Sequence, residues 1–141
     1  MIDPVLEAAY RATDYCVDVP GEGRVVLRIG VPSAPFDSAL KAAGWQSWAI
    51  LAAVNPWSQP CTEAENAARH QALLAAVAIS GWSTWPGVNL AADGNWPPEP
   101  ALCLLDIPLS EALRLAEGFQ QNAFVAPDGH GLPSLVWVGR A

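Results

Sequence analysis

Residues 48–81 constrain the fold more than any other stretch, because they join an unbroken apolar run to a strongly capped helix. The run WAILAAVN at 48–55 is too short and too uniformly apolar for a surface helix, so we expect a strand covered on both faces. Thr62 and Glu65 form an S/T-x-x-E capping box, which starts a helix that reaches about Ile79. The chain therefore alternates strands with helices.

The rest of the chain divides by the same criteria. Glycine- and proline-containing turns separate runs that are rich in β-branched and apolar residues, and two further segments repeat their apolar residues at helical spacing. We expect strands at 14–19, 24–31, 100–107, 122–126 and 134–139, and helices at 34–44 and 110–119.

The order is thus strand, strand, helix, strand, helix, strand, helix, strand, strand. It indicates an α/β or α+β fold, with a single mixed sheet of about six strands and three helices in one domain spanning residues 1–141. The pattern leaves the strand order open. Residues Gly81–Pro100 show no clear element, and loops of this length usually serve as lids or binding loops. This stretch is therefore either a missed strand or the rim of a site.

Composition excludes several classes of function. Fourteen acidic residues against seven basic ones give a formal charge of -7, and the single lysine is Lys41, so we expect no nucleic-acid binding. The N-terminus lacks a basic signal region and no apolar run is long enough for a membrane span, so we expect a cytoplasmic protein. The cysteines are widely spaced and only two histidines accompany them, so we expect free thiols, no metal site and no cofactor.

Polar residues follow the 48–55 strand in a segment that we name the Asn55–Pro60 corner. Ligands of sheets with helical crossovers settle beyond the carboxyl ends of strands, where Asn55 and Ser58 provide hydrogen-bonding groups. The next helix also presents free backbone N–H groups suited to an anion or an acyl oxygen. Alternatively, Asn55 only caps the strand and starts an Asn-Pro turn.

Two more polar residues fall near apolar stripes. Asn66 lies four residues before His70 in the helix, so both side chains face inward, and we expect Asn66 to bond to the Asn55–Pro60 corner. Glu99 lies between a tryptophan-rich loop and an apolar strand, where desolvation would raise the pKa of its carboxyl. The alternative for Glu99 is an ordinary solvated carboxylate.

Tryptophan is frequent in this chain, with seven residues. Large aromatic side chains in loops roof a pocket, anchor a partner or pack over the core. The tryptophans that fall in expected loops are Trp57, Trp82, Trp85 and Trp96.

Four ordered motifs, WAILAAVNPWS, AENAARHQALL, NWPPE and FQQNAF, resemble those of a small uncharacterised bacterial family known as domain of unknown function 3293. The resemblance spans residues 45–126. It departs from the family pattern at Ala52, where the pattern has threonine, and at Gln120, where it has glycine. The resemblance implies no established activity. Its motif positions here are Asn55, Pro56, Ser58, Glu65, Asn66, Trp96, Glu99, Gln121 and Asn122.

Two functions remain open from the sequence. The first is a pocket for a small polar ligand, with or without hydrolytic or transfer chemistry, under a rim formed by residues 82–96. The second is an acidic module that docks on a protein partner, or on a second copy, through its loop tryptophans. The sequence fixes neither the ligand, nor whether the protein is an enzyme, nor its oligomeric state. The ligand-binding residues predicted for the first function are Asn55, Ser58, Asn66, Glu99, Gln121 and Asn122.

Overall fold

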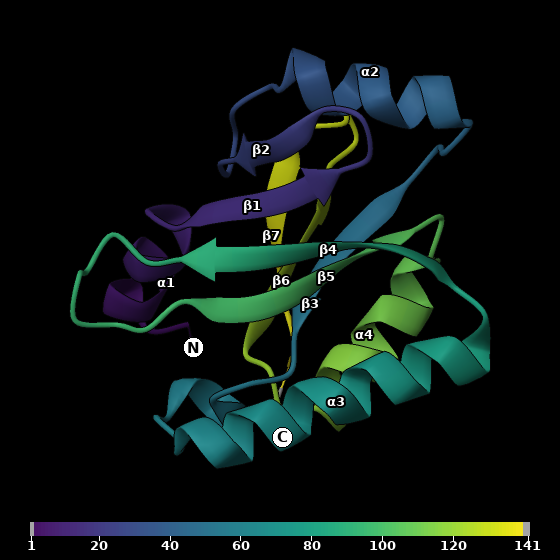
Figure 1. The fold of residues 1–141 in the computed structure, drawn as a ribbon. Coiled ribbons are helices and arrows are strands. Elements are labelled where there is room, and N and C mark those ends of the chain that lie inside the picture. The colour runs from purple at the N-terminus through teal and green to yellow at the C-terminus, as the bar shows by residue number, and fades with distance from the viewer. Residues whose placement is uncertain (1, 140–141) are drawn as a thin grey trace.

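The structure is a computed structural model that describes residues 2–139, and in that range the chain forms one seven-stranded sheet and four α-helices (Figure 1). The strands are β1 (Asp14–Val19), β2 (Gly23–Leu27), β3 (Trp48–Ala52), β4 (Ser83–Leu90), β5 (Glu99–Leu105), β6 (Ala123–Pro127) and β7 (Pro133–Trp137). The helices are α1 (Pro4–Arg11), α2 (Ala34–Ala43), α3 (Glu63–Ser80) and α4 (Leu109–Gly118).

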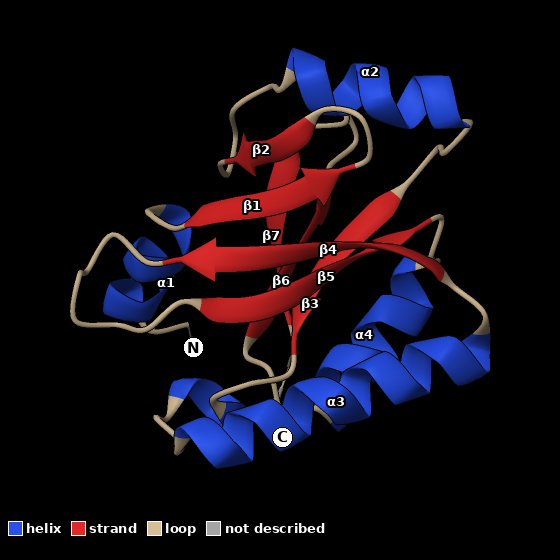
Figure 2. Cartoon of the chain, in the orientation of Figure 1, coloured by secondary structure: helices blue, strands red, loops and turns tan. Residues whose placement is uncertain are grey.

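The sheet has the order β2-β1-β4-β5-β3-β6-β7, and every neighbouring pair is antiparallel. The expectation of a mixed sheet is therefore wrong, although the α+β class is confirmed. In Figure 2, β3, β6 and β7 run across the direction of β1, β4 and β5, so the sheet is strongly curled. The curl brings its two edges together, where the backbone N–H of Gly30 donates to the carbonyl of Pro133 at 2.8 Å.

Each face of the sheet has its own apolar core. Inside the curl, Tyr15, Val17, Ile50 and other side chains pack with α2, whose Phe36 makes edge-to-face contacts with Trp48 and Trp85. On the outer face, α3 and α4 cover the alternate residues of β3, β5 and β6. All five residues of β3 are buried as a result, which confirms the prediction of a strand covered on both faces.

The structure contains two elements that the sequence analysis did not predict. The helix α1 is capped by Asp3, whose side chain accepts a hydrogen bond from the N–H of Val5, and begins at Pro4. The strand β4 occupies Ser83–Leu90, inside the stretch that showed no clear element. The chain returns from α3 along β4, and β4 then pairs with β5 in the antiparallel sense. Because this additional strand reverses the direction in which β5 runs, the described sheet contains no parallel pair.

Pro86 and Gly87 explain why β4 was hard to recognise, since both residues are usually depleted in strand interiors. Pairing between β1 and β4 stops at Gly87, so Pro86 lies outside that ladder. A Cβ atom at Gly87 would lie 2.4 Å from the carbonyl oxygen of Cys16. Glycine is therefore required for β1 and β4 to approach one another.

The remaining local predictions agree with the structure to within a few residues. The β1–β2 and β6–β7 hairpins form as expected, and the capping box of Thr62 and Glu65 is present at the start of α3. Within residues 2–139, no helix has the length and apolar character that crossing a membrane requires.

Candidate functional site

A cavity of about 210 Å³ lies inside the curl of the sheet, at the end that α1 covers; we name it the α1 cavity. Its apolar wall comes mainly from β3, the segment directly after it and β6, through Ile50, Ala52, Val54 and Val125. The polar side chains that line it are Tyr10, Thr13, Tyr15, Asn55, Ser58, Asn89, Asp93, Trp96, Glu99 and Gln121.

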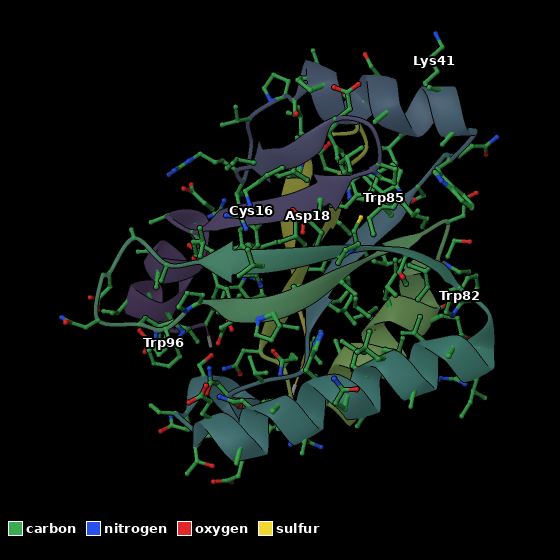
Figure 3. The ribbon with its side chains drawn as sticks, in the orientation of Figure 1. Cys16, Asp18, Lys41, Trp82, Trp85 and Trp96 are labelled. Atoms are coloured by element: carbon green, nitrogen blue, oxygen red, sulfur yellow. The ribbon has the colours of Figure 1, made fainter. Side chains whose placement is uncertain are left out.

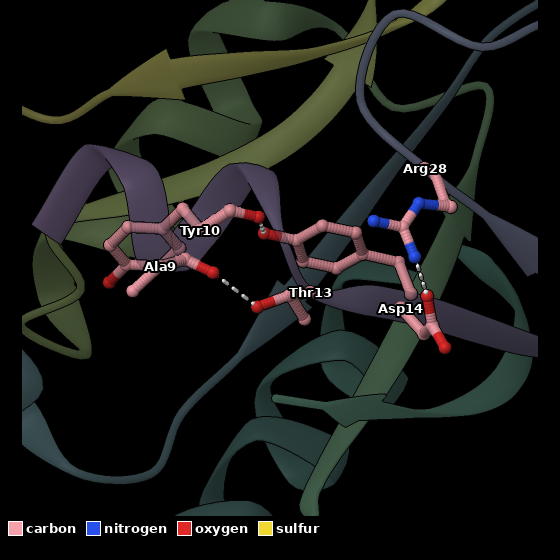
Figure 4. Close-up of polar contacts among 6 residues, drawn as sticks. Ala9, Tyr10, Thr13, Asp14 and Arg28 are labelled. Carbon is pink, nitrogen blue, oxygen red and sulfur yellow. Dashed lines mark hydrogen bonds and ion pairs between the residues drawn. The ribbon is translucent and has the colours of Figure 1, made fainter. Parts of the chain in front are cut away.

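The helix α1 forms one wall of the cavity and is fastened at its C-terminal end. The hydroxyl of Tyr15 donates to the carbonyl of Tyr10 at 2.7 Å, and the hydroxyl of Thr13 donates to the carbonyl of Ala9 at 2.8 Å (Figure 4). The Tyr10 ring also meets Trp137 of β7 edge to face, with centroids 5.5 Å apart. These contacts hold the Tyr10 side chain over the cavity.

Asn55 is the centre of one hydrogen-bond network. Its Oδ1 accepts from the N–H of Cys61 at 3.1 Å and from Nδ2 of Asn66 at 2.8 Å, and its Nδ2 donates to Oε2 of Glu99 at 2.6 Å. Its backbone N–H donates to Oδ1 of Asn66 at 2.9 Å, so the predicted bond between Asn66 and the corner is confirmed. Asn55 thus ties α3 to β5.

Ser58 is the centre of a second network on the same side of the corner. Its Oγ shares a hydrogen bond of 2.9 Å with the hydroxyl of Tyr10 and accepts from Nδ2 of Asn122 at 2.9 Å. Gln121 lies close by, and its Nε2 donates to the carbonyls of Val54 and Phe119 at 3.0 Å each. The ends of β3 and α4 and the helix α1 therefore meet at this corner.

Glu99 places a half-buried carboxyl in the wall of the α1 cavity. Burial raises its pKa, and the hydrogen bonds from Asn55 and Trp96 offset part of that rise. Burial also raises the pKa of Tyr10, whose Ser58 partner acts in the opposite direction while the nearby charge of Glu99 raises it further. Of the two interpretations of Glu99 that the sequence left open, its half-buried position and raised pKa therefore favour the desolvated carboxyl over the solvated one.

Asn89 completes a row of side chains across three strands. Tyr15 of β1 stands opposite Asn89 of β4, which stands opposite Glu99 of β5, so the three side chains share one face of the sheet. The Oδ1 atom of Asn89 is buried and has no hydrogen-bond partner within the described chain. Such atoms are rare in proteins because each costs about 1–3 kcal/mol of desolvation.

The Asn55–Pro60 corner is also strained. Asn55, Trp57 and Ser58 have φ values of 49°, 54° and 60°, in the left-handed region that bulky residues seldom adopt. The N–H of Trp57 donates to the carbonyl of Gln120 at 2.6 Å, and that of Ser58 donates to the carbonyl of Asn55 at 2.9 Å. The surrounding structure therefore holds an unfavourable backbone in place, as is common at functional sites.

The structure brings the six predicted site residues close together, but not all of them reach the cavity. Asn55, Ser58, Glu99 and Gln121 line the α1 cavity. Asn66 instead lines a second hollow between the start of α3 and the loop before β5, and Asn122 supports Ser58 without lining the α1 cavity.

One wall of the cavity was not predicted from the sequence; it is formed by Tyr10, Thr13, Tyr15 and Asn89. For the first two, a signal was present in the Asp-Pro pair that caps α1 and the apolar spacing that follows it. For Asn89, the signal was obscured by Pro86 and Gly87, which concealed β4 and with it the alternation that directs Asn89 inward.

The loop tryptophans do not form one rim. Trp85 lies in β4 and is buried, so its placement in a loop is wrong. Trp57, Trp82 and Trp96 are half-buried. Figure 3 shows Trp96 beside α1, whereas Trp82 lies at the opposite end of α3. Only Trp96 of these four lines the α1 cavity.

Other reactive side chains lie outside this site. All three cysteines are free, with Cys16 and Cys103 buried, as expected. Among residues 2–139, no group of three or more His, Cys, Asp and Glu side chains is placed to hold a metal ion. His70 of α3 is half-buried with an unpartnered Nδ1, and burial lowers its pKa.

A scan against protein-family models matches residues 51–124, just over half of the chain, to the family described as protein of unknown function DUF3293. The chain belongs to the DUF3293 family. The DUF3293 segment contains all six predicted site residues, whereas Tyr10, Thr13 and Tyr15 precede it. Neither the curated proteins nor the solved structures yielded a match.

The structure places the two residues that depart from the DUF3293 pattern, Ala52 and Gln120. Ala52 lines the α1 cavity, so the threonine of the pattern would place a hydroxyl at its wall. Gln120 has a φ of 52°, where glycine carries no steric cost, and its Oε1 accepts from Nη2 of Arg69 at 2.8 Å. The Gln120 side chain thus has a hydrogen-bond partner, whereas its backbone is held in an unfavourable left-handed conformation.

Proposed function

We propose that this DUF3293 protein binds a small polar molecule in the α1 cavity. The observation that carries the proposal is a mainly apolar hollow with a desolvated carboxyl, Glu99, and an unpartnered amide oxygen, that of Asn89, on one wall. Binding sites typically combine an apolar lining with a few convergent polar groups. A ligand that bonds to Asn89 would remove its desolvation cost.

The size of the α1 cavity limits the ligand. A water molecule in the liquid occupies about 30 Å³, so the cavity has room for roughly seven waters, or for a ligand of about ten non-hydrogen atoms. This is smaller than the sites that hold drug-sized molecules or dinucleotides. We therefore assign the cavity to a compact molecule.

The hydrogen-bond networks favour binding over nucleophilic chemistry. Among the described residues that line the cavity, only Ser58 has an aliphatic primary hydroxyl, and its partners are the phenol of Tyr10 and the amide of Asn122. Burial raises the pKa of Tyr10, which makes its phenol a poor base at neutral pH. Glu99 can exchange a proton with a ligand, whereas neither partner of the Ser58 hydroxyl in the described chain is a base that activates a nucleophile.

The docking function based on loop tryptophans has less support. Within residues 2–139, none of the large apolar side chains that are well exposed is a tryptophan. The exposed ones include Val5, Ile79 and Leu109, which belong to different helices. A docking surface would need its apolar side chains to form one contiguous patch. Protein partnership therefore remains a prediction from the sequence alone.

A ligand screen with a blocked cavity tests the proposed function. Small amines, alcohols, amides and carboxylates are added singly to the protein, and binding is followed by saturation-transfer NMR and by the shift in Tm. Ala52→Leu serves as the blocked variant because Ala52 lines the cavity and its side chain would extend into it. We expect at least one compound class to bind the native protein and to lose binding in Ala52→Leu.

Two results would contradict the proposal. One is that no compound class binds the native protein at millimolar concentration. The other is that the bound compounds bind Ala52→Leu equally well, which would place them elsewhere. A urea titration of Ala52→Leu confirms that the variant is folded before its binding is compared.

A further inference from the structure

The charged side chains of the α1 cavity are all acidic. Of the described residues that line it, none is lysine, arginine or histidine, whereas Asp93 and Glu99 both line it. A ligand anion in this cavity would be desolvated without a cationic partner and would lie close to the Glu99 carboxylate. The chemistry of the wall therefore disfavours carboxylates and phosphates.

Glu99 keeps one oxygen available. The hydrogen bonds that it accepts from Asn55 and Trp96 both fall on Oε2, at 2.6 and 3.3 Å, and within the described chain Oε1 receives none. The unpartnered Oδ1 of Asn89 belongs to the residue directly opposite on β4. The two neighbouring acceptors, Glu99 Oε1 and Asn89 Oδ1, thus favour a ligand that donates two or more hydrogen bonds.

Aromatic rings in the cavity wall also favour a cationic ligand. Tyr10, Tyr15 and Trp96 line the cavity around Glu99, and their faces attract cations that have been desolvated. A primary ammonium group has three donors and a positive charge, so it satisfies the carboxylate, the amide oxygen and a ring at once. Its apolar substituent would lie against Ile50, Val54 and Val125.

We propose that the ligand of the α1 cavity is a small organic cation, a primary amine with a compact apolar body, held by Glu99 Oε1 and Asn89 Oδ1. This inference rests on the proposed function and specifies its ligand class. Binding couples to the protonation of Glu99, since the ammonium group requires the carboxylate form. Three further titratable groups line the cavity near Glu99: Tyr10 of α1, Tyr15 of β1 and Asp93 of the β4–β5 loop.

The two tyrosines remain neutral at physiological pH because burial raises the pKa of each. Asp93 lies in an exposed segment and is the other acidic residue that lines the cavity. Amine binding should therefore strengthen as the pH rises through the pKa of Glu99 and level off above it.

Three compounds of nearly equal size provide the test: benzylammonium, benzyl alcohol and benzoate. Their dissociation constants are measured by isothermal titration calorimetry at about pH 7.5 on the native protein, on Glu99→Gln and on Glu22→Gln. Glu22 is an exposed residue of the β1–β2 turn, so its variant removes the same charge away from the cavity.

We expect benzylammonium to bind the native protein at least tenfold more tightly than either analogue. Glu99→Gln should weaken benzylammonium by about ten- to hundredfold, as expected for a hydrogen bond to a charged group, and change benzyl alcohol by less than about threefold. Glu22→Gln should change neither. The comparison of the three compounds on the native protein is decisive even if Glu99→Gln folds poorly.

The amine proposal is overturned if benzyl alcohol or benzoate binds as tightly as benzylammonium, or if folded Glu99→Gln retains native affinity for the amine. Those results would leave unaffected the broader proposal that the α1 cavity binds a small molecule. If none of the three compounds binds, the amine proposal also fails, and the broader screen decides separately whether the cavity binds any small molecule.

Discussion

Asn55 and Asn66 exchange two hydrogen bonds: Asn66 Oδ1 accepts from the backbone N–H of Asn55 at 2.9 Å, and Asn66 Nδ2 donates to Asn55 Oδ1 at 2.8 Å. The pair joins the end of β3 to the first turns of α3. Because Asn55 also donates to Glu99, the pair fixes the carboxyl that faces the α1 cavity. A structural bond between two amides thus positions a candidate ligand-binding group.

Replacement of Asn66 by alanine should destabilise the protein. The change leaves the buried N–H of Asn55 and one acceptor position of its side chain without their partners, which costs about 1–3 kcal/mol. Urea denaturation measures the free energy of unfolding. Asn95→Ala in the exposed β4–β5 loop is the matched control, and we expect it to change stability by less than about 0.5 kcal/mol. Equal effects of the two variants would refute the structural role of Asn66.

Replacement of Glu99 by glutamine should change how stability depends on pH. Burial raises the pKa of Glu99 in the folded protein, so the folded state holds this proton more tightly than the unfolded chain. The stabilisation is complete below the unfolded pKa of about 4.5 and is lost as the pH rises through the folded pKa.

Glutamine does not titrate, so Glu99→Gln should gain stability relative to the native protein as the pH rises above the unfolded pKa of about 4.5. Denaturation curves at several pH values measure this difference. Glu22→Gln, at an exposed site, should show no such trend. A difference between Glu99→Gln and native protein that is constant with pH would contradict the burial of the Glu99 charge.

Two substitutions at Gln120 separate backbone strain from side-chain bonding. Glycine and alanine both remove the bond from Arg69, but only glycine relieves the left-handed conformation. We expect Gln120→Gly to be more stable than Gln120→Ala by about 1 kcal/mol, whereas glycine is the less stable of the two at ordinary positions. Thermal unfolding compares them. A more stable alanine variant would show that Gln120 is not strained.

A methyl group at Gly87 should disrupt the contact between β1 and β4. The added Cβ would lie 2.4 Å from the carbonyl oxygen of Cys16, which is backbone and cannot move aside easily. We expect Gly87→Ala to lose about 2 kcal/mol or more of stability, within the range of overpacked interiors. Gly94→Ala meets no atom within 4 Å and serves as the control. Equal unfolding midpoints for the two variants would contradict the strand register.

The parts of the fold that could be predicted are those whose signals are local. The capping box at Thr62, the glycine turns and the apolar periodicity of α3 and α4 depend on nearby residues, so the sequence indicates them directly. The same holds for Asn66, because helical spacing places it on the inner face. The bond between Asn66 and the Asn55–Pro60 corner could be anticipated for this reason.

The missed parts depend on contacts between distant segments. Pro86 is acceptable in β4 only because the ladder with β1 ends at Gly87, which no local pattern reveals. The direction of the strands depends on β4 as well, so one missed strand also produced the wrong sheet type. Tyr10 reaches the cavity through contacts with Ser58 and Trp137, which are far away in the chain.

The indole N–H of Trp96 reports on the α1 cavity most directly, because Trp96 lines it and donates to Glu99 at 3.3 Å. Two-dimensional ¹H–¹⁵N NMR follows this resonance while benzylammonium, or the tightest compound from the screen, is added to the native protein and to Ala52→Leu. We expect a saturable shift of the Trp96 indole resonance in the native protein and none in Ala52→Leu. An indole resonance that stays fixed in the native protein, or moves equally in both, would contradict ligand binding in the α1 cavity.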